Sequence, residues 1–373
     1  MAESKPMKTD EENAIDRLSS LPDSVLFHIL SFLPTKTCVS TITLISHRYL
    51  HLWKHLQVFE FHDDSQYPFE ETERLKTFAA FVNSVLTLRK SRDIRKMRLS
   101  GAYSLSDTLY TNSFDTWIRA AIGPYLEELH LFIFPVDGDQ FPPPPSLFTC
   151  PNIVSLSLCG GILLPLKHSS VVRLPSLKTL KLDICYEDVD SVDVLLSGCP
   201  ILETLDLSFA PKSFSNIRMP RSLKMLKFTV DNNIGVCLGK LDAPNLNYLI
   251  INHVTFSSIG DLHNVLEAHL DVFPPPSQSA SVESLLKLLQ ALSKITYLFM
   301  GVLTIKVKLG FQGYVDEVRF AEYILRNGLV LKNMIIVNAL MDLKKKDSVI
   351  KKLSDIPRGS AICKLQFDSA ASP

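Results

Sequence analysis

The first strong hydrophobic pattern in the chain is the segment LPDSVLFHILSFLP at residues 21–34. Pro22 has the φ of a first helical position, and Pro34 cannot continue a helix, so the prolines predict one short helix. At about 100° per residue, its apolar side chains cover an arc of about 180°. A surface helix needs an apolar stripe of only a little over about 100°. We therefore expect this helix to be covered on two sides, either by its own domain alone or by its own domain and a partner chain.

A second pattern begins near residue 94, in which an apolar residue, two variable residues, an apolar residue, one variable residue and an apolar residue follow one another. Nine copies start 19 to 32 residues apart, and the central spacings fit the roughly 20 to 29 residues that are typical of leucine-rich repeats. The apolar positions are Ile94, Met97, Leu99; Leu126, Leu129, Leu131; Ile153, Leu156, Leu158; Leu177, Leu180, Leu182; Leu202, Leu205, Leu207; Leu223, Leu226, Phe228; Leu246, Leu249, Ile251; Val265, Ala268, Leu270; and Ile295, Leu298, Met300. Each copy predicts one strand, and the array predicts a parallel sheet curved into a horseshoe.

The variable residues inside the repeats would alternate outward onto the concave face of that sheet. Taken singly, each of them can be an ordinary solvated side chain, but the concave face of a repeat protein is its usual binding surface. The chemistry changes from mixed polar in the middle of the array to aromatic near its end. The candidate target-binding residues are His130, Lys181, Asp206, Lys227, Tyr248, Ile250, His269, Tyr297 and Phe299.

Composition limits the kinds of partner. Lys plus Arg and Asp plus Glu number 39 each, so no overall field draws the chain to nucleic acid or to an acidic membrane. No apolar run reaches the length of a membrane span, and the first residues lack the apolar core of a signal peptide. Seven cysteines without C-x-x-C pairs argue against a disulfide framework or a zinc module. We expect an intracellular protein of the nucleus, the cytoplasm or both, without a nucleic-acid or membrane partner.

Recurring catalytic motifs are missing from the sequence. It contains no G-x-S-x-G, no H-E-x-x-H, no Walker loop and no G-x-G-x-x-G. His263, Glu267 and His269 cluster within one repeat, where solvated side chains are a more common outcome than metal ligands. The sequence predicts a non-catalytic protein with no cofactor and no metal.

Residues 16–53 resemble the F-box of plant F-box/leucine-rich-repeat proteins through L-P-x-x-x-L-x-x-I-L-S-F-L-P-T-K and a later Leu-Trp pair. In that family, the F-box binds a Skp-type adaptor, which is held by a cullin-RING scaffold. The resemblance implies that one set of residues forms the adaptor-binding surface and the small F-box core: Leu21, Pro22, Leu26, Ile29, Leu30, Phe32, Leu33, Pro34, Leu52 and Trp53. A partner chain would then cover the outer face of the first helix.

The F-box departs from the family pattern in one place. Between Lys36 and Ser46 the spacing is one residue longer than is usual, and His47 and Tyr49 stand where Lys and Trp are common. Because one extra residue turns a helix face by about 100°, this departure bears on the affinity for the adaptor.

Residues 311–368 resemble the FBD module that follows the repeats in many of these proteins, through Y-I-L-x-N-G, V-L-K-x-M and P-R-G-S. The local pattern predicts a helix at 316–327, a strand at 334–337, a helix at 342–354 and a strand at 361–367, which would cap the end of the solenoid. Residues 294–313 pass from the last repeat into this module without the further repeat that the family generally has, so we expect a shortened joint.

The sequence therefore predicts an α/β chain with a small helical F-box, a leucine-rich-repeat horseshoe and an α+β FBD-like cap. The expected division is a flexible N-terminus at 1–15, the F-box at 16–60, the repeats at 61–305, the FBD-like module at 306–368 and a tail at 369–373. The predicted function is that of a substrate-recognition subunit of a Skp-cullin-F-box ubiquitin ligase, with an unknown target protein. Two alternatives are an F-box scaffold or decoy without ligase assembly, and a co-receptor that needs a small ligand in a basic pocket near Lys181 and Lys227.

Overall fold

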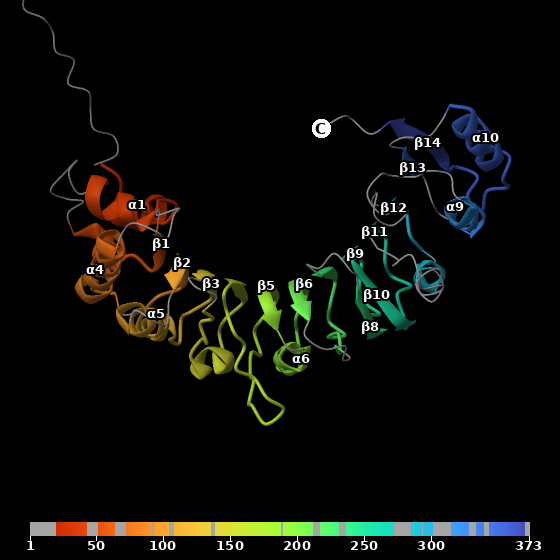
Figure 1. Cartoon of the computed structure of the whole chain (residues 1–373). Coiled ribbons are helices and arrows are strands. Elements are labelled where there is room, and N and C mark those ends of the chain that lie inside the picture. Colours follow the sequence, from red (N-terminus) through yellow and green to blue (C-terminus); the bar gives the residue numbers. More distant parts are fainter. Residues whose placement is uncertain are drawn as a thin grey trace, which may run out of the picture.

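The chain forms an arc in which the strands line the inner side (Figure 1). The computed structural model describes residues 20–42, 51–63, 72–91, 93–103, 108–135, 139–187, 189–211, 217–230, 236–271, 285, 287–292, 294–300, 315–327, 333–338 and 343–369. The predicted flexible N-terminus at 1–15 lies outside these residues. Residues 301–313, which belong to the expected shortened joint, also lie outside them.

The main sheet contains ten parallel strands in the order β1-β2-β3-β4-β5-β6-β7-β9-β11-β12. Their bounds are β1 Val58–His62, β2 Lys96–Tyr103, β3 Glu128–Pro135, β4 Ser155–Gly160, β5 Thr179–Glu187, β6 Thr204–Pro211, β7 Met225–Val230, β9 Tyr248–Asn252, β11 Glu267–Asp271 and β12 Tyr297–Met300. A second, two-stranded parallel sheet pairs β8, Val236–Leu241, with β10, Val254–Ile259. Since each main strand pairs with the strand of the next repeat, the predicted α/β solenoid is confirmed.

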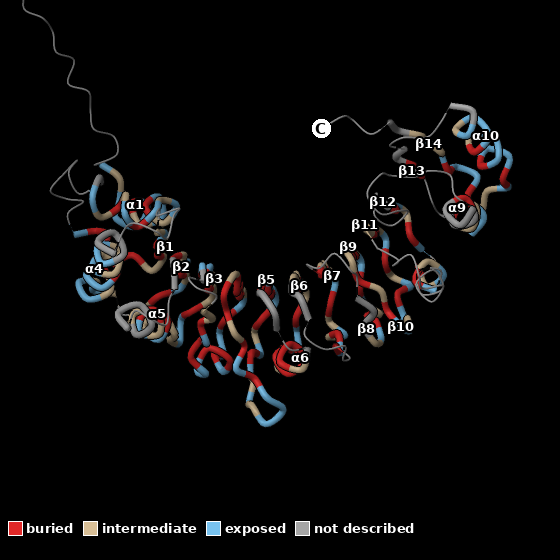
Figure 2. The backbone as a smooth tube through the Cα atoms, viewed as in Figure 1, coloured by how far each residue is buried: buried red, intermediate tan, exposed pale blue. Residues whose placement is uncertain are grey.

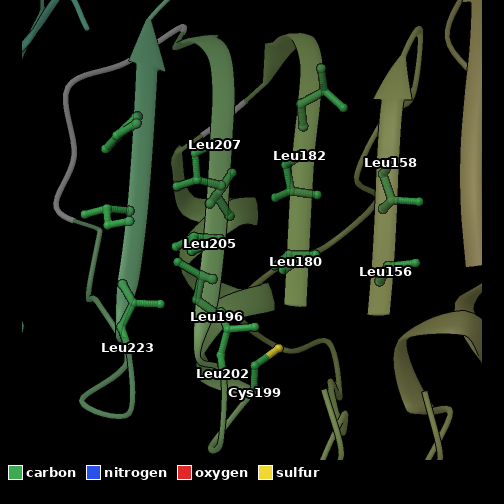
Figure 3. Close-up of a cluster of buried hydrophobic side chains, with 14 of the residues drawn as sticks. Leu156, Leu158, Leu180, Leu182, Leu196, Cys199, Leu202, Leu205, Leu207 and Leu223 are labelled. Carbon is green, nitrogen blue, oxygen red and sulfur yellow. The ribbon is translucent and has the colours of Figure 1, made fainter. Parts of the chain in front are cut away.

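The leucines of the repeats stack in register across the sheet. Leu156 aligns with Leu180, and Leu180 aligns with Leu205. Figure 3 shows these side chains on neighbouring strands, and all three are fully shielded from solvent. Burying one such side chain contributes about 1.5–3 kcal/mol, so the repeated triplets form a continuous, strongly stabilising row through the core. Buried positions run along the arc on the strands and also on the outer side at α6 (Figure 2).

The structure contains one further copy of the repeat that the sequence pattern had not predicted. Strand β1 pairs in parallel with β2, and its triplet is Leu56, Phe59 and Phe61, all of which are buried. The spacing is that of the other copies, but two of the three positions are phenylalanine. The main sheet therefore begins directly after the helical N-terminal part of the chain.

Helices lie along the outer side of the arc (Figure 1). They are α4 Thr72–Leu88, α5 Thr108–Ala121 and α6 Val189–Ser197, with a short 3-10 helix, η3, at Pro145–Thr149. Trp117 of α5 is completely buried, and its indole Nε1 donates a hydrogen bond to Asn83 Oδ1 of α4 at 2.7 Å. This bond satisfies the one polar group of a large core side chain and joins two neighbouring repeats.

The two ends of the arc are built differently. The N-terminal end carries α1 Asp23–Leu30, α2 Thr35–Thr37, a π-helical turn η1 Cys38–Ile42 and a 3-10 turn η2 Leu52–His55. The C-terminal end carries α9 Val315–Asn327, β13 Asn333–Asn338, α10 Leu343–Ser354 and β14 Lys364–Ser369, with β13 and β14 paired in parallel. These four elements lie within a few residues of the predicted ones, and β13 lies next to β12. Among the described residues, no helix is long and apolar enough to cross a membrane.

Candidate functional site

Helix α1 is short because proline and a turn bound it on both sides. Pro22 is extended and stands immediately before the helix, rather than in its first turn. After Leu30 the chain turns, with the Ser31 N–H bonded to the Phe27 carbonyl at 3.0 Å and the Ser31 hydroxyl donating to the His28 carbonyl at 2.7 Å. The apolar residues of the segment are thereby divided between a helix and the turn that follows it.

Burial divides the ten candidate adaptor residues into three groups. Leu26, Leu30, Leu52 and Trp53 are buried and form the core between α1 and η2. Leu21 and Leu33 are partly buried and pack against that core. Pro22, Ile29, Phe32 and Pro34 are exposed. The segment thus faces both its own core and solvent, as the width of its apolar arc indicated.

An apolar surface runs along the outer side of this segment. It consists of Val25, Ile29 and Phe32, of which Phe32 is 73% exposed, and we name these three residues the α1 patch. The Phe32 ring packs edge-on against His28, with 4.9 Å between ring centroids. Val25 was not among the predicted site residues. Its spacing of four and seven residues from Ile29 and Phe32 is the signal that could have identified it.

The predicted extra residue between Lys36 and Ser46 coincides with an irregular helix. Residues Cys38–Ile42 form a π-helical turn, η1, directly after α2. A π turn contains one residue more than an α turn, so it can take up an inserted residue locally. The buried Cys38 thiol donates to the Leu30 carbonyl at 3.4 Å and holds the start of this turn against α1. Residues 43–50, including the departures at His47 and Tyr49, lie outside the described residues.

The helical end is fixed to the sheet by a buried hydroxyl. Thr35 is buried, and its Oγ1 accepts a hydrogen bond of 2.7 Å from the backbone N–H of Glu60 on β1. Since β1 is the first strand of the main sheet, α1 and the repeats have a defined connection.

The target-binding candidates share one face of the main sheet. Successive register pairs place seven of them in a single row, with Ser157 between the first two: His130, Lys181, Asp206, Lys227, Ile250, His269 and Phe299. Tyr248 and Tyr297 stand in the adjacent row, on either side of Glu267. The repeat pattern therefore brought all nine onto one surface, which we name the concave face.

Charges on the concave face are largely paired. Lys227 Nζ lies 3.3 Å from Asp206 Oδ2, and Lys96 Nζ lies 2.7 Å from Glu128 Oε1. Burial lowers the pKa of His130, and the positive charge of Arg98 lowers it further. Two of the lysines in the N-terminal and middle parts of the face are thus paired with carboxylates.

Aromatic side chains gather at both ends of the concave face. Near the C-terminal end, the ring of His269 lies 5.6 Å from Tyr248, 5.8 Å from Tyr297 and 5.5 Å from Phe299, measured between centroids. Near the N-terminal end, Phe132 and Phe134 of β3 are exposed and pack edge-to-face at 4.6 Å. The sequence analysis missed this second pair, although both residues continue the two-residue alternation that begins at His130.

A metal-binding group or a reactive thiol would give the described residues a chemical function. No group of three or more His, Cys, Asp or Glu side chains there could hold a metal ion. The five described cysteines are free and buried. Burial raises the pKa of the Cys38 thiol to about 11 and that of Cys199 to about 12, which makes both poor nucleophiles.

The chain matches two family descriptions. Residues 114–268 match the leucine-rich repeats of "FBD-associated F-box protein At5g56370", and residues 304–336 match FBD. The first match covers strands β3 to β10 and reaches the start of β11, and the second covers α9 and the first part of β13.

Three Arabidopsis thaliana proteins illustrate the similarity. The chain is 28% identical to F-box/FBD/LRR-repeat protein At1g78750 over 72% of its own length and 59% of that protein. It is 38% identical to FBD-associated F-box protein At4g10400 over 51% of its own length and 44% of that protein. It is 32% identical to F-box/LRR-repeat protein At4g14103 over 70% of its own length and 69% of that protein. Overall, the chain spans about half of the length of most of these relatives and about two thirds of At4g14103. The chain therefore belongs to the plant family of F-box, leucine-rich-repeat and FBD proteins.

Proposed function

We propose that this protein is the substrate-recognition subunit of a Skp-cullin-F-box ubiquitin ligase. The α1 patch binds a Skp-type adaptor, and the concave face binds a target protein. Ubiquitin transfer is carried out by other subunits. The chain contributes proximity, since a target that is held near a charged ubiquitin carrier is present at a high effective concentration.

The observation that supports this proposal is that α1 has two apolar sides, of which one is buried in the core and the other is exposed. Leu26 and Leu30 are buried in the core, whereas Val25 and Ile29 on the same helix and Phe32 after it are exposed. Large apolar side chains at this spacing fit the binding of a helix in an apolar groove of a partner. The family membership supports the choice of adaptor as that partner.

The rest of the molecule suits the second half of the proposal. Helices cover the outer side of the arc, and the concave face is open along the main sheet (Figure 1). That face carries side chains of different chemistry at successive positions of one row, as a surface selective for one protein requires. The small-ligand alternative needs a basic pocket near Lys181 and Lys227. Lys227 is already paired with Asp206.

Co-purification tests the proposal. The full chain is expressed with an affinity tag, together with a Skp-type adaptor and a cullin, as the native sequence and as an Ile29→Asp, Phe32→Asp double variant. Val171→Asp is the matched control, because Val171 is 69% exposed and lies between β4 and β5, away from α1. We expect the native chain and the control to retain both partners and the double variant to lose them.

The opposite result would favour a different function. If the folded native chain retains no adaptor, the α1 patch serves another contact, and the scaffold or decoy alternative takes the place of the ligase subunit.

A further inference from the structure

Six side chains at the C-terminal end of the concave face form a grid of two rows on three strands. Strands β9, β11 and β12 place Tyr248, Glu267 and Tyr297 side by side in one row. The next row contains Ile250, His269 and Phe299. Neighbouring strands lie about 4.8 Å apart, so the two tyrosines stand on opposite sides of one carboxylate, about 10 Å from each other. We name Tyr248, Glu267, His269, Tyr297 and Phe299 the aromatic cluster.

The carboxylate of Glu267 is accessible within this cluster. Its side chain is 41% exposed, and Oε1 lies 2.8 Å from His269 Nε2. That contact orients the carboxylate and leaves Oε2 to accept a hydrogen bond from a bound group. Tyr297 and Phe299 are 37% and 40% exposed, so their rings are accessible on the same face.

The three strands carry carboxylates but no lysine or arginine. Their sequences are YLIIN, EAHLD and YLFM, and both carboxylates belong to EAHLD. The nearest lysine in the register, Lys227 beside Ile250, is paired with Asp206. Slight burial raises the pKa of Tyr248, and the negative charge of Glu267 raises it further, so this phenol stays neutral near pH 7.

We propose that the aromatic cluster binds a lysine or arginine side chain of the target protein. The cation would lie at Glu267 Oε2, beside the ring of His269, with the rings of Tyr248 and Tyr297 on either side. Aromatic faces attract a cation within about 6 Å, and a carboxylate adds a charge-assisted hydrogen bond. The assignment of this cation to a target protein rests on the proposed function. The selection of a cation by the cluster is independent of that function.

An apolar side chain fits the cluster less well. It would cover Glu267 and remove water from a carboxylate without supplying a positive partner, which is unfavourable. An acidic side chain would be repelled by Glu267. A cation alone gains from both the rings and the carboxylate, and this complementarity of charge decides the choice.

The test uses fluorine NMR of the full chain labelled with 3-fluorotyrosine. The Tyr248 and Tyr297 signals are assigned with Tyr→Phe variants. The probes are Nα-acetyl-arginine N-methylamide and the uncharged citrulline counterpart, titrated at equal ionic strength. Tyr125, which is 54% exposed and lies just before β3, is the internal control. Two variants accompany the titration. Glu267→Gln keeps the shape of the site and removes its charge, and Phe132→Ala removes an equally exposed ring at the other end of the face.

We expect saturable shifts of Tyr248 and Tyr297 with the arginine probe and no comparable shift of Tyr125. The citrulline probe should bind about tenfold more weakly, and Glu267→Gln should weaken the arginine probe by a similar factor, since each contact of this kind contributes modestly at an exposed site. Phe132→Ala should leave the titration unchanged. Equal binding of the two probes, or an unchanged affinity in Glu267→Gln, would overturn the inference.

Adaptor binding by the same labelled sample separates the two proposals. If the adaptor binds and the probes are not distinguished, the cation site is wrong and the ligase proposal stands. If the probes are distinguished and the adaptor does not bind, the cation site stands and the ligase proposal fails.

Discussion

At the residue scale, adjacent positions on α1 have different surroundings. Leu30 is buried beside Leu52 and Trp53 on η2, while Ile29 points to solvent. A carboxylate at Leu30 would have to be buried without a partner, whereas one at Ile29 would remain hydrated. Only the exposed position can be used to test binding without changing the fold.

This difference gives the first prediction. Leu30→Asp should lower the free energy of unfolding by about 3 kcal/mol or more, and Ile29→Asp by less than about 1 kcal/mol. Urea denaturation followed by circular dichroism measures both. Equal losses in the two variants would mean that Ile29 also belongs to the core.

Cys199 gives the second prediction, which concerns pH. Burial raises the pKa of its thiol from 9.0 to about 12, so in the folded chain it stays protonated where the unfolded chain has already lost the proton. The unfolded state is therefore favoured increasingly from about pH 9 to pH 12, and stability should fall across that range. At pH 8, labelling of Cys199 by iodoacetamide should be roughly a thousandfold slower in the folded than in the unfolded chain. Mass spectrometry locates the label, and rapid labelling of Cys199 under native conditions would contradict the account.

At the element scale, the repeat triplet determines both the strands and their register. Leu180 aligns with Leu156 and Leu205, so the sequence positions of the leucines were sufficient to predict neighbouring strands and a shared face. The triplet of β1 was missed because the pattern was followed only from residue 94 onward, while residues 56–60 were assigned to the F-box. Phe59 and Phe61 fit the apolar positions of the repeat, since side-chain size and burial matter to the core more than residue identity.

The division of α1 between core and surface lay beyond the sequence. A helical arc shows how wide the apolar face is, but it does not show which part is covered. In the fold, Leu52 and Trp53 cover one part, and Thr35 of α2 joins the helical N-terminal end to β1 through a hydrogen bond. These contacts join residues that are far apart in sequence. Similarly, the repeat pattern placed Tyr248 and Tyr297 on one face, but the pairing of β9, β11 and β12 was needed to show Glu267 between them.

An ion pair between elements gives the third prediction. Asp193 on α6 accepts hydrogen bonds from the Arg218 backbone N–H at 2.8 Å and from its Nη2 at 2.7 Å. Burial alone would raise the pKa of Asp193, but the hydrogen bonds and charge of Arg218 together outweigh it and hold the pKa below its usual value. This stabilisation is present above about pH 4 and is lost as the pH falls through the lowered pKa.

Asp193→Asn should therefore lower the free energy of unfolding at pH 7 by about 1–2 kcal/mol. The difference from the native chain should shrink below about pH 4, where the native carboxyl is itself protonated. Asp183→Asn, at an exposed position of β5, is the control. Denaturant titrations at several pH values measure the effect, and a difference that does not depend on pH would rule out the ion pair as its origin.

At the scale of the whole molecule, the two proposed binding surfaces differ in chemistry and lie on one arc. The α1 patch is apolar and stands at the N-terminal end, while the aromatic cluster is on the concave face near the C-terminal end (Figure 1). The main sheet connects them through ten hydrogen-bonded strands. A target on the concave face would thus be held at a fixed position relative to the adaptor, as transfer of ubiquitin by proximity requires.

Isothermal titration calorimetry of the purified full chain with a purified Skp-type adaptor tests the central claim most directly. The account predicts saturable one-to-one binding by the native chain and by Val171→Asp. It predicts an affinity about a hundredfold or more lower for the Ile29→Asp, Phe32→Asp variant, because two exposed apolar anchors are lost from the centre of the interface. Unfolding transitions that match those of the native chain would show that the variant is folded. Equal affinity of the native chain and the double variant, or no binding by the folded native chain, would contradict the assignment of the α1 patch as the adaptor surface.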